Sequence, residues 1–125
     1  MLHLTLVALG GAIGAAFRHL ANHFALRFAG PNFPWGTMVI NIAGSFAMGL
    51  FIGYLVRRSG SSNELRLFVS TGILGGFTTF SAFSLDFATL WERGEAVSAA
   101  GYVLASVCGA IIALFCGLWL ARSIG

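Results

Sequence analysis

The chain has 125 residues, of which 58% are hydrophobic and only 9% are charged, and its formal net charge is +3. A soluble domain carries about 25% charged residues, and so short a chain buries too small a fraction of its surface to hide this many apolar side chains from water. The composition therefore excludes a soluble globular protein. The positive charge does not indicate nucleic-acid binding either, because the arginines are scattered along the chain.

Four apolar stretches predict four transmembrane helices, since a helix of about 20 mostly apolar residues crosses a bilayer. We place them at residues 4–28, 35–57, 64–91 and 96–122, with short turns between them. The first is the least uniform, because Arg18 falls in its second half, where it is expected to reach the headgroups or to pair within an assembly. The prediction is an all-α integral membrane protein, with residues 1–125 forming a single transmembrane domain.

Asn41 lies in the second span, with Thr37 one turn before it and Ser45 one turn after it. An asparagine in a bilayer needs a hydrogen-bond partner, so its usual role is to join helices. Its amide N–H groups are also suitable donors to an anion. The sequence leaves both roles open.

The third span predicts a helix break near residues 75–79. Three glycines, Gly72, Gly75 and Gly76, precede Thr78 and Thr79, and this run forms poor continuous helix. A break leaves carbonyls without partners at membrane depth, where they must face protein, water or an ion, and such helix ends recur as cation sites near the midplane. Close helix packing through the glycines is an equally good explanation.

After the break, Phe80 and Phe83 share one helix face, and Ser81 and Ser84 lie on an adjacent face. An aromatic stripe in a membrane helix is usually a packing or lipid-facing surface. The edges of aromatic rings are nevertheless positive, so ring edges and hydroxyl donors together can meet an anion. Enzyme chemistry is not predicted, because His19 and His23 are one turn apart without a third metal ligand at a suitable spacing.

The arginines set almost no preferred orientation in the membrane. With four spans, Arg57, Arg58, Arg66 and Arg122 lie on one side, and Arg18, Arg27 and Arg93 lie on the other. Because cytoplasmic loops normally carry the excess of basic residues, this near balance predicts that the chain inserts either way up.

Three segments of the sequence resemble the Fluc (CrcB) family of fluoride channels, and the resemblance covers essentially the whole chain. They are the glycine-rich stretch from Gly10 to Arg18, the stretch from Pro34 through Asn41 to Phe46, and the run Gly75-Gly-Phe-Thr-Thr-Phe-Ser-Ala-Phe-Ser84. The last run is highly specific, whereas a GxxxG pair alone is not.

The resemblance implies a passive fluoride channel that relieves fluoride toxicity from the plasma (inner) membrane of a microbe. It also implies an antiparallel, dual-topology homodimer in the lipid bilayer, with a structural sodium ion (Na⁺) at the two-fold axis. The residues that correspond to the fluoride pathway are Asn41, Thr79, Phe80, Ser81, Phe83, Tyr102 and Ser106. Arg18 corresponds to an arginine near a pore entrance, and Gly75 and Thr78 correspond to residues that hold Na⁺ through backbone carbonyls.

The chain departs from the family pattern at three positions. Ala82 stands where threonine is common, Asp86 where glutamate is common, and Ala110 where some members have a hydroxyl. The first and third departures remove hydroxyls, so any role of those positions in the pathway is lost here.

A small dual-topology multidrug transporter is the main alternative, because it too has four spans in a short chain. Proton coupling would need a carboxylate inside the membrane, and only Asp86, at the end of a span, is available. A non-conducting assembly subunit would explain the packing glycines but not the Thr-Thr-Phe-Ser run from Thr78 to Ser81.

Overall fold

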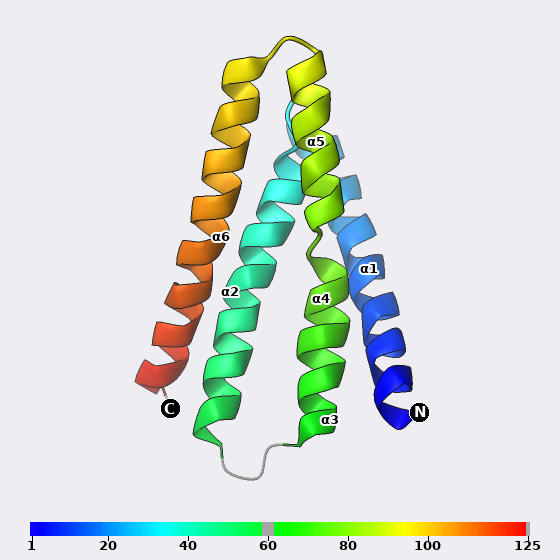
Figure 1. Ribbon diagram of the computed structural model, residues 1–125, viewed down its shortest axis with the longest axis vertical. Coiled ribbons are helices and arrows are strands. Elements are labelled where there is room, and N and C mark those ends of the chain that lie inside the picture. The colour runs from blue at the N-terminus through cyan, green and yellow to red at the C-terminus, as the bar shows by residue number, and fades with distance from the viewer. Residues whose placement is uncertain (59–61, 125) are drawn as a thin grey trace.

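The computed structural model describes residues 1–58 and 62–124, and all the regular structure in these ranges is helical (Figure 1). In chain order the elements are α1 (Leu2–Ala29), α2 (Trp35–Arg57), α3 (Asn63–Arg66), the π-helix η1 (Leu67–Leu74), α4 (Gly75–Phe77), α5 (Phe80–Glu92) and α6 (Ala96–Ile124). The elements from α3 to α5 follow one another along the third span, which is interrupted between α4 and α5.

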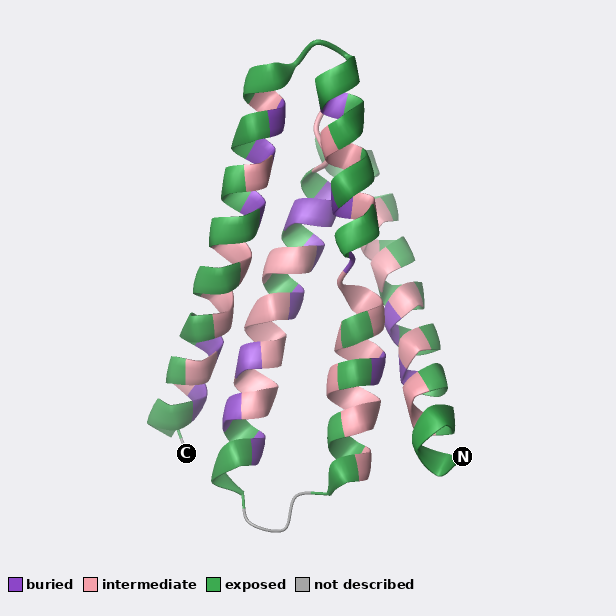
Figure 2. Ribbon diagram, in the orientation of Figure 1, coloured by how far each residue is buried: buried purple, intermediate pink, exposed green. Residues whose placement is uncertain are grey.

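Four helical segments are long and apolar enough to cross a membrane: α1, α2, the segment from Asn63 to Glu92, and α6. The N-terminal ends of α1 and α3 lie at the same end of the bundle as the C-terminal ends of α2 and α6 (Figure 1). Many large apolar side chains are exposed, among them Leu9, Ile112 and Phe115, and exposed residues occur along every long helix (Figure 2). Lipid is the solvent that such a surface requires, so the protein is a multi-pass membrane protein.

Glycines allow the helices to approach closely in two pairs. In the first pair, a Cβ added at Gly10 or Gly14 of α1 would overlap the carbonyl oxygen of Phe68 or Ile73. In the second pair, a Cβ added at Gly49 of α2 would overlap the Leu114 carbonyl oxygen of α6. In a bilayer, such small-residue contacts contribute the van der Waals packing that associates helices.

The first half of the third span begins with a capped helical turn and continues as a π-helix. Ser62 caps α3 by accepting a hydrogen bond from the Leu65 N–H at its Oγ, at 3.1 Å. From Leu67 the helix widens into η1, and the Gly75 N–H that follows it points to the carbonyls of both Gly72 and Ser70. A π-helical segment inside a longer helix frequently accompanies a functional site, and here only the short α4 separates it from the break.

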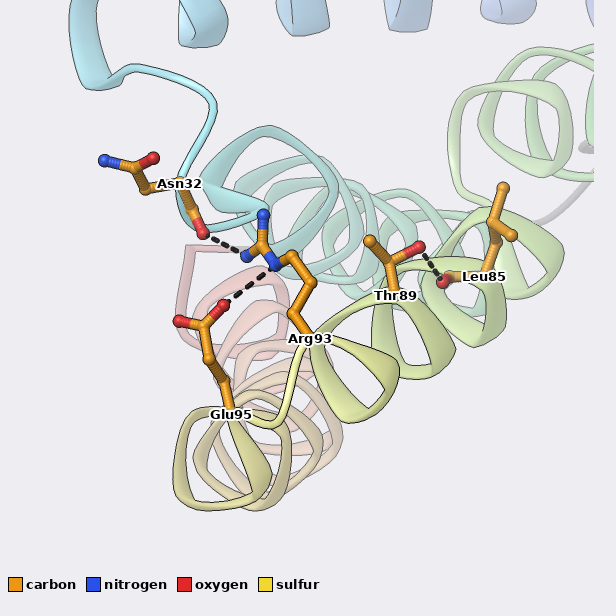
Figure 3. Close-up of polar contacts among 5 residues, drawn as sticks. All are labelled: Asn32, Leu85, Thr89, Arg93 and Glu95. Atoms are coloured by element: carbon orange, nitrogen blue, oxygen red, sulfur yellow. Dashed lines mark hydrogen bonds and ion pairs between the residues drawn. The ribbon is translucent and has the colours of Figure 1, made fainter.

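The turn between α5 and α6 is tied to the connection between α1 and α2. Arg93 donates through Nη2 to the Asn32 carbonyl at 2.7 Å and pairs through Nε with Glu95 at 2.8 Å (Figure 3). On α5, the Thr89 hydroxyl donates to the Leu85 carbonyl at 2.9 Å. The Arg93–Asn32 hydrogen bond joins the two connections, at the end of the bundle opposite the start of α1.

Candidate functional site

The break in the third span consists of two extended residues between α4 and α5. Thr78 has φ −79° and ψ 156°, and Thr79 has φ −152° and ψ 121°. The Thr78 hydroxyl donates to the Leu74 carbonyl at 3.0 Å, and the Thr79 hydroxyl accepts from the Ala82 N–H at 3.1 Å. The two threonines therefore cap the helices on both sides of the break, a role that Ser and Thr hydroxyls perform well.

Asn41 of α2 satisfies both backbone groups of Thr79. Its Nδ2 donates to the Thr79 carbonyl at 3.0 Å, and its Oδ1 accepts from the Thr79 N–H at 2.8 Å. An extended residue at membrane depth has no water to bond its peptide groups. The asparagine amide replaces that water, so Asn41 joins α2 to the third span beside the break. Its role as a donor to an anion stays a prediction.

Because of these bonds, two backbone N–H groups at the break donate to side-chain oxygens and not to the carbonyls of a continuous α-helix. In a continuous α-helix, the Thr79 N–H would bond to the Gly75 carbonyl and the Ala82 N–H to the Thr78 carbonyl. Here the first N–H goes to Asn41 and the second to the Thr79 hydroxyl. The carbonyls of Gly75 and Thr78 are thereby deprived of their helical partners, which makes them suitable oxygen donors for a hard cation.

A groove of about 300 Å³, here called the central groove, opens beside the break. Its walls come from α2, the break, α5 and α6, and none of the described residues that line it is charged. The lining residues are Asn41, Gly44, Ser45, Met48, Thr78, Thr79, Phe80, Phe83, Ser106, Val107, Ala110 and Leu114.

Two aromatic rings and one hydroxyl give the central groove its chemical character. The Phe80 and Phe83 rings lie 5.5 Å apart between centroids and are tilted by 48°; Phe80 is 76% exposed and Phe83 only 9%. Ser106 is 4% exposed, and within the described part of the chain its Oγ has no hydrogen-bond partner. Ring edges and a free hydroxyl donor in an uncharged groove suit a small anion.

The structure brings most of the predicted site residues together. Asn41, Thr79, Phe80, Phe83 and Ser106 all line the central groove, as does Thr78. Gly75 lies one helical turn before Thr78, at the start of α4.

The other two predicted pathway residues, Ser81 and Tyr102, lie outside the lining, as does Arg18, which was predicted near a pore entrance. The Ser81 hydroxyl is 3.3 Å from that of Thr79. Tyr102 is fully buried behind Phe83, with ring centroids 5.2 Å apart, and its hydroxyl donates to Asp86 Oδ2 at 3.0 Å. Arg18 is on α1, from which no residue lines the central groove.

Several lining residues were not among the predicted site residues, although helical spacing could have identified them. Ser45 and Met48 follow Asn41 at i+4 and i+7, and so share its face of α2. On α6, Ala110 and Leu114 follow Ser106 at i+4 and i+8 in the same way. Met48 is held by Ser70 of η1, whose hydroxyl lies 3.2 Å from the methionine sulfur.

An uncharged groove of hydroxyls, an amide and ring edges between membrane-spanning helices defines a channel or transporter rather than a soluble binding protein. The chain matches the family described as CrcB-like protein, Camphor Resistance (CrcB), over residues 5–118. This match covers most of the chain, and the protein belongs to the CrcB family.

Curated relatives extend the similarity over the whole length. A protein of Mesorhizobium japonicum named fluoride-specific ion channel FluC is 73% identical over 124 residues, which is 99% of each chain. Proteins of the same name from a Chelativorans species and from Agrobacterium fabrum are 64% and 53% identical over the same coverage. The predicted family is confirmed.

Proposed function

We propose that this protein is a passive, fluoride-selective channel that exports fluoride across the plasma (inner) membrane of a microbe. It is not an enzyme. The observation that carries the proposal is the central groove, where the buried Ser106 hydroxyl has no described partner and the Phe80 and Phe83 rings lie side by side. The names of the relatives agree with this chemistry.

Fluoride is the halide that this donor set favours. It is small and holds water strongly, so it needs close donors to replace its hydration shell. Ser106 supplies an O–H and the rings supply positive edges, and no charged residue in the lining binds the anion so tightly that it cannot leave. An anion that weakly binds several such donors in turn can pass without a coupled reaction.

We further propose that the Gly75 and Thr78 carbonyls hold a structural Na⁺. The two carbonyls have lost their helical donors to Asn41 and Thr79, which supports this role. Within residues 1–58 and 62–124, no three His, Cys, Asp or Glu side chains lie together as a metal site. When bound, the ion would neutralise the carbonyl dipoles at the break.

The functional assembly we propose is an antiparallel homodimer. One chain contributes two such carbonyls, which is a small part of the ligand set of a hard cation, and a second copy would double it. Two copies in opposite orientations recreate the inverted-repeat design, in which broken helices meet at the midplane. The arginine balance of four against three permits both orientations.

Reconstitution tests the proposed activity directly. Purified protein in liposomes loaded with fluoride should release it down its gradient, as recorded with a fluoride electrode, and should pass chloride far more slowly. Equal rates for chloride and fluoride, or a requirement for a proton gradient, would contradict the channel proposal. The second outcome would favour the transporter alternative.

A further inference from the structure

A second and larger groove lies at the end of the bundle where α2 and α6 finish, away from the break (Figure 1). It has a volume of about 720 Å³ and is here called the arginine groove. Its lining residues are Ala47, Leu50, Phe51, Tyr54, Arg57, Arg58, Ala121 and Ile124. The α2 members recur at intervals of three and four, so they form one continuous stripe along the helix.

Two guanidinium groups close the end of this stripe. Arg58 lies over the Tyr54 ring, 4.9 Å from its centroid, in a cation–π contact. Arg57 donates from Nη1 to the Arg122 carbonyl in the last turn of α6. None of the chain's four acidic residues lines the groove. Among the described residues, no carboxylate therefore lies in the groove to balance the guanidinium charges.

The length of the stripe along α2 matches the hydrocarbon thickness of one leaflet of a bilayer. From Ala47 to Arg58 the helix rises about 16 Å, at about 1.5 Å per residue. Half of a hydrocarbon core of about 30 Å is about 15 Å. The arginines at the end of α2 thus lie at headgroup depth when the apolar stripe lies among acyl chains.

We propose that the arginine groove binds an anionic phospholipid, with its phosphate on Arg57 and Arg58 and one acyl chain along the stripe from Tyr54 to Ala47. Guanidinium groups bind phosphate oxygens with paired hydrogen bonds, and basic pockets between transmembrane helices take acidic lipid headgroups. The described residues that line the groove include no carboxylate to attract the positive amine of a zwitterionic lipid. This site shares no lining residue with the central groove.

Native mass spectrometry of the purified full chain tests this proposal. The protein is equilibrated with equal amounts of phosphatidylglycerol and phosphatidylcholine of the same acyl chains, and retained lipids are counted. We expect phosphatidylglycerol to be retained in preference. Arg58→Gln should lower that preference about fivefold, since one arginine near an anionic headgroup contributes about 1 kcal/mol. Ala47→Phe fills the apolar stripe without changing the charge, and should reduce retention of the lipid itself.

Arg66→Gln is the matched control, because it removes one charge at the same end of the bundle, whereas Arg66 itself lines a different cavity. It should leave the preference unchanged. An equal loss in Arg58→Gln and Arg66→Gln would mean general attraction to a basic surface and would overturn the proposal. Equal retention of both lipids by the wild type would also overturn it. A change in monomer–dimer balance with Ala47→Phe, without lipid loss, would assign the groove to a second copy of the chain.

Discussion

Asn41 has a side chain whose two polar groups are both bonded to the backbone of one residue, Thr79, 38 positions away in the sequence. This arrangement makes the amide a support for the break as well as a wall of the central groove. Removing one partner of a buried hydrogen bond leaves the other unsatisfied, at a cost of about 1–3 kcal/mol. The consequences of substitution at this position are therefore large and specific to the atom changed.

Asn41→Asp should lower fluoride flux in liposomes by about tenfold or more, as expected from a loss on the scale of one buried hydrogen bond. The carboxylate still accepts from the Thr79 N–H, but it cannot donate to the Thr79 carbonyl, and it adds a negative charge to the path of an anion. The dimer should persist on size-exclusion chromatography. Asn32→Asp adds the same charge in the connection between α1 and α2 and should conduct normally. Wild-type flux from Asn41→Asp would leave Asn41 with a helix-joining role alone.

Ser106 allows conduction to be separated from stability. Its buried Oγ has no described partner, so Ser106→Ala removes no hydrogen bond from the resting protein and should not lower the free energy of unfolding. Fluoride flux should nevertheless fall, by about tenfold if the hydroxyl donates one bond to the anion in transit. Ser98→Ala on the same helix, outside the groove, is the control. A Ser106→Ala protein that conducts normally would remove the serine from the pathway.

The third span shows at the scale of an element what a single sequence predicts and what it does not. Glycines followed by two threonines weaken a helix at known positions, so a break near residues 75–79 was predictable; the structure confines it to Thr78 and Thr79 and keeps Gly75–Phe77 helical. The π-helix η1 was not predictable, because nothing in the apolar run Leu67–Leu74 distinguishes it from α-helix.

The contacts of the site lie on different helices, and periodicity identifies the face of a helix but not its partner. It placed Asn41 on one face with Ser45 but gave no means of finding Thr79. Nor could periodicity predict that the Tyr102 ring packs against Phe83 and that its hydroxyl donates to Asp86, outside the groove lining. The four spans were predictable because length and hydrophobicity alone determine what can cross a bilayer.

The neighbouring glycines Gly10 and Gly11 of α1 are expected to differ in how much a substitution by alanine lowers stability. Gly10→Ala should destabilise the protein by about 1–3 kcal/mol, the usual cost of overpacking, because the new Cβ would overlap the Phe68 carbonyl and lie 2.9 Å from Gly72 Cα. Gly11→Ala should be neutral, since no atom lies within 4 Å of its added Cβ. Unfolding in detergent, followed by circular dichroism, measures both. Equal stability of the two variants would mean that α1 does not pack on η1 in this way.

At the scale of the whole molecule, the last prediction tests the proposed antiparallel dimer. Gly75 is exposed in a single protomer, and a Cβ added there meets only the Ser70 carbonyl at an ordinary 3.5 Å. Within one chain, Gly75→Leu should therefore be tolerated. If a second copy brings its own break against this one, the same side chain must collide with it. We expect Gly75→Leu to lose the dimer on size-exclusion chromatography and to lose fluoride flux with it.

Gly101→Leu provides the control, because Gly101 is also exposed, with no atom within 4 Å of an added Cβ, and it lies on α6 away from the break. It should remain dimeric. Orientation is measured separately, with a tag at one terminus of the wild-type chain. Because the arginines are divided four to three between the two sides, the tag should be labelled from both faces of the membrane in one population of cells. Labelling from one face only would rule out the antiparallel arrangement. A parallel dimer would not bring the two breaks together about an axis in the membrane plane, so the shared Na⁺ site would be ruled out with it.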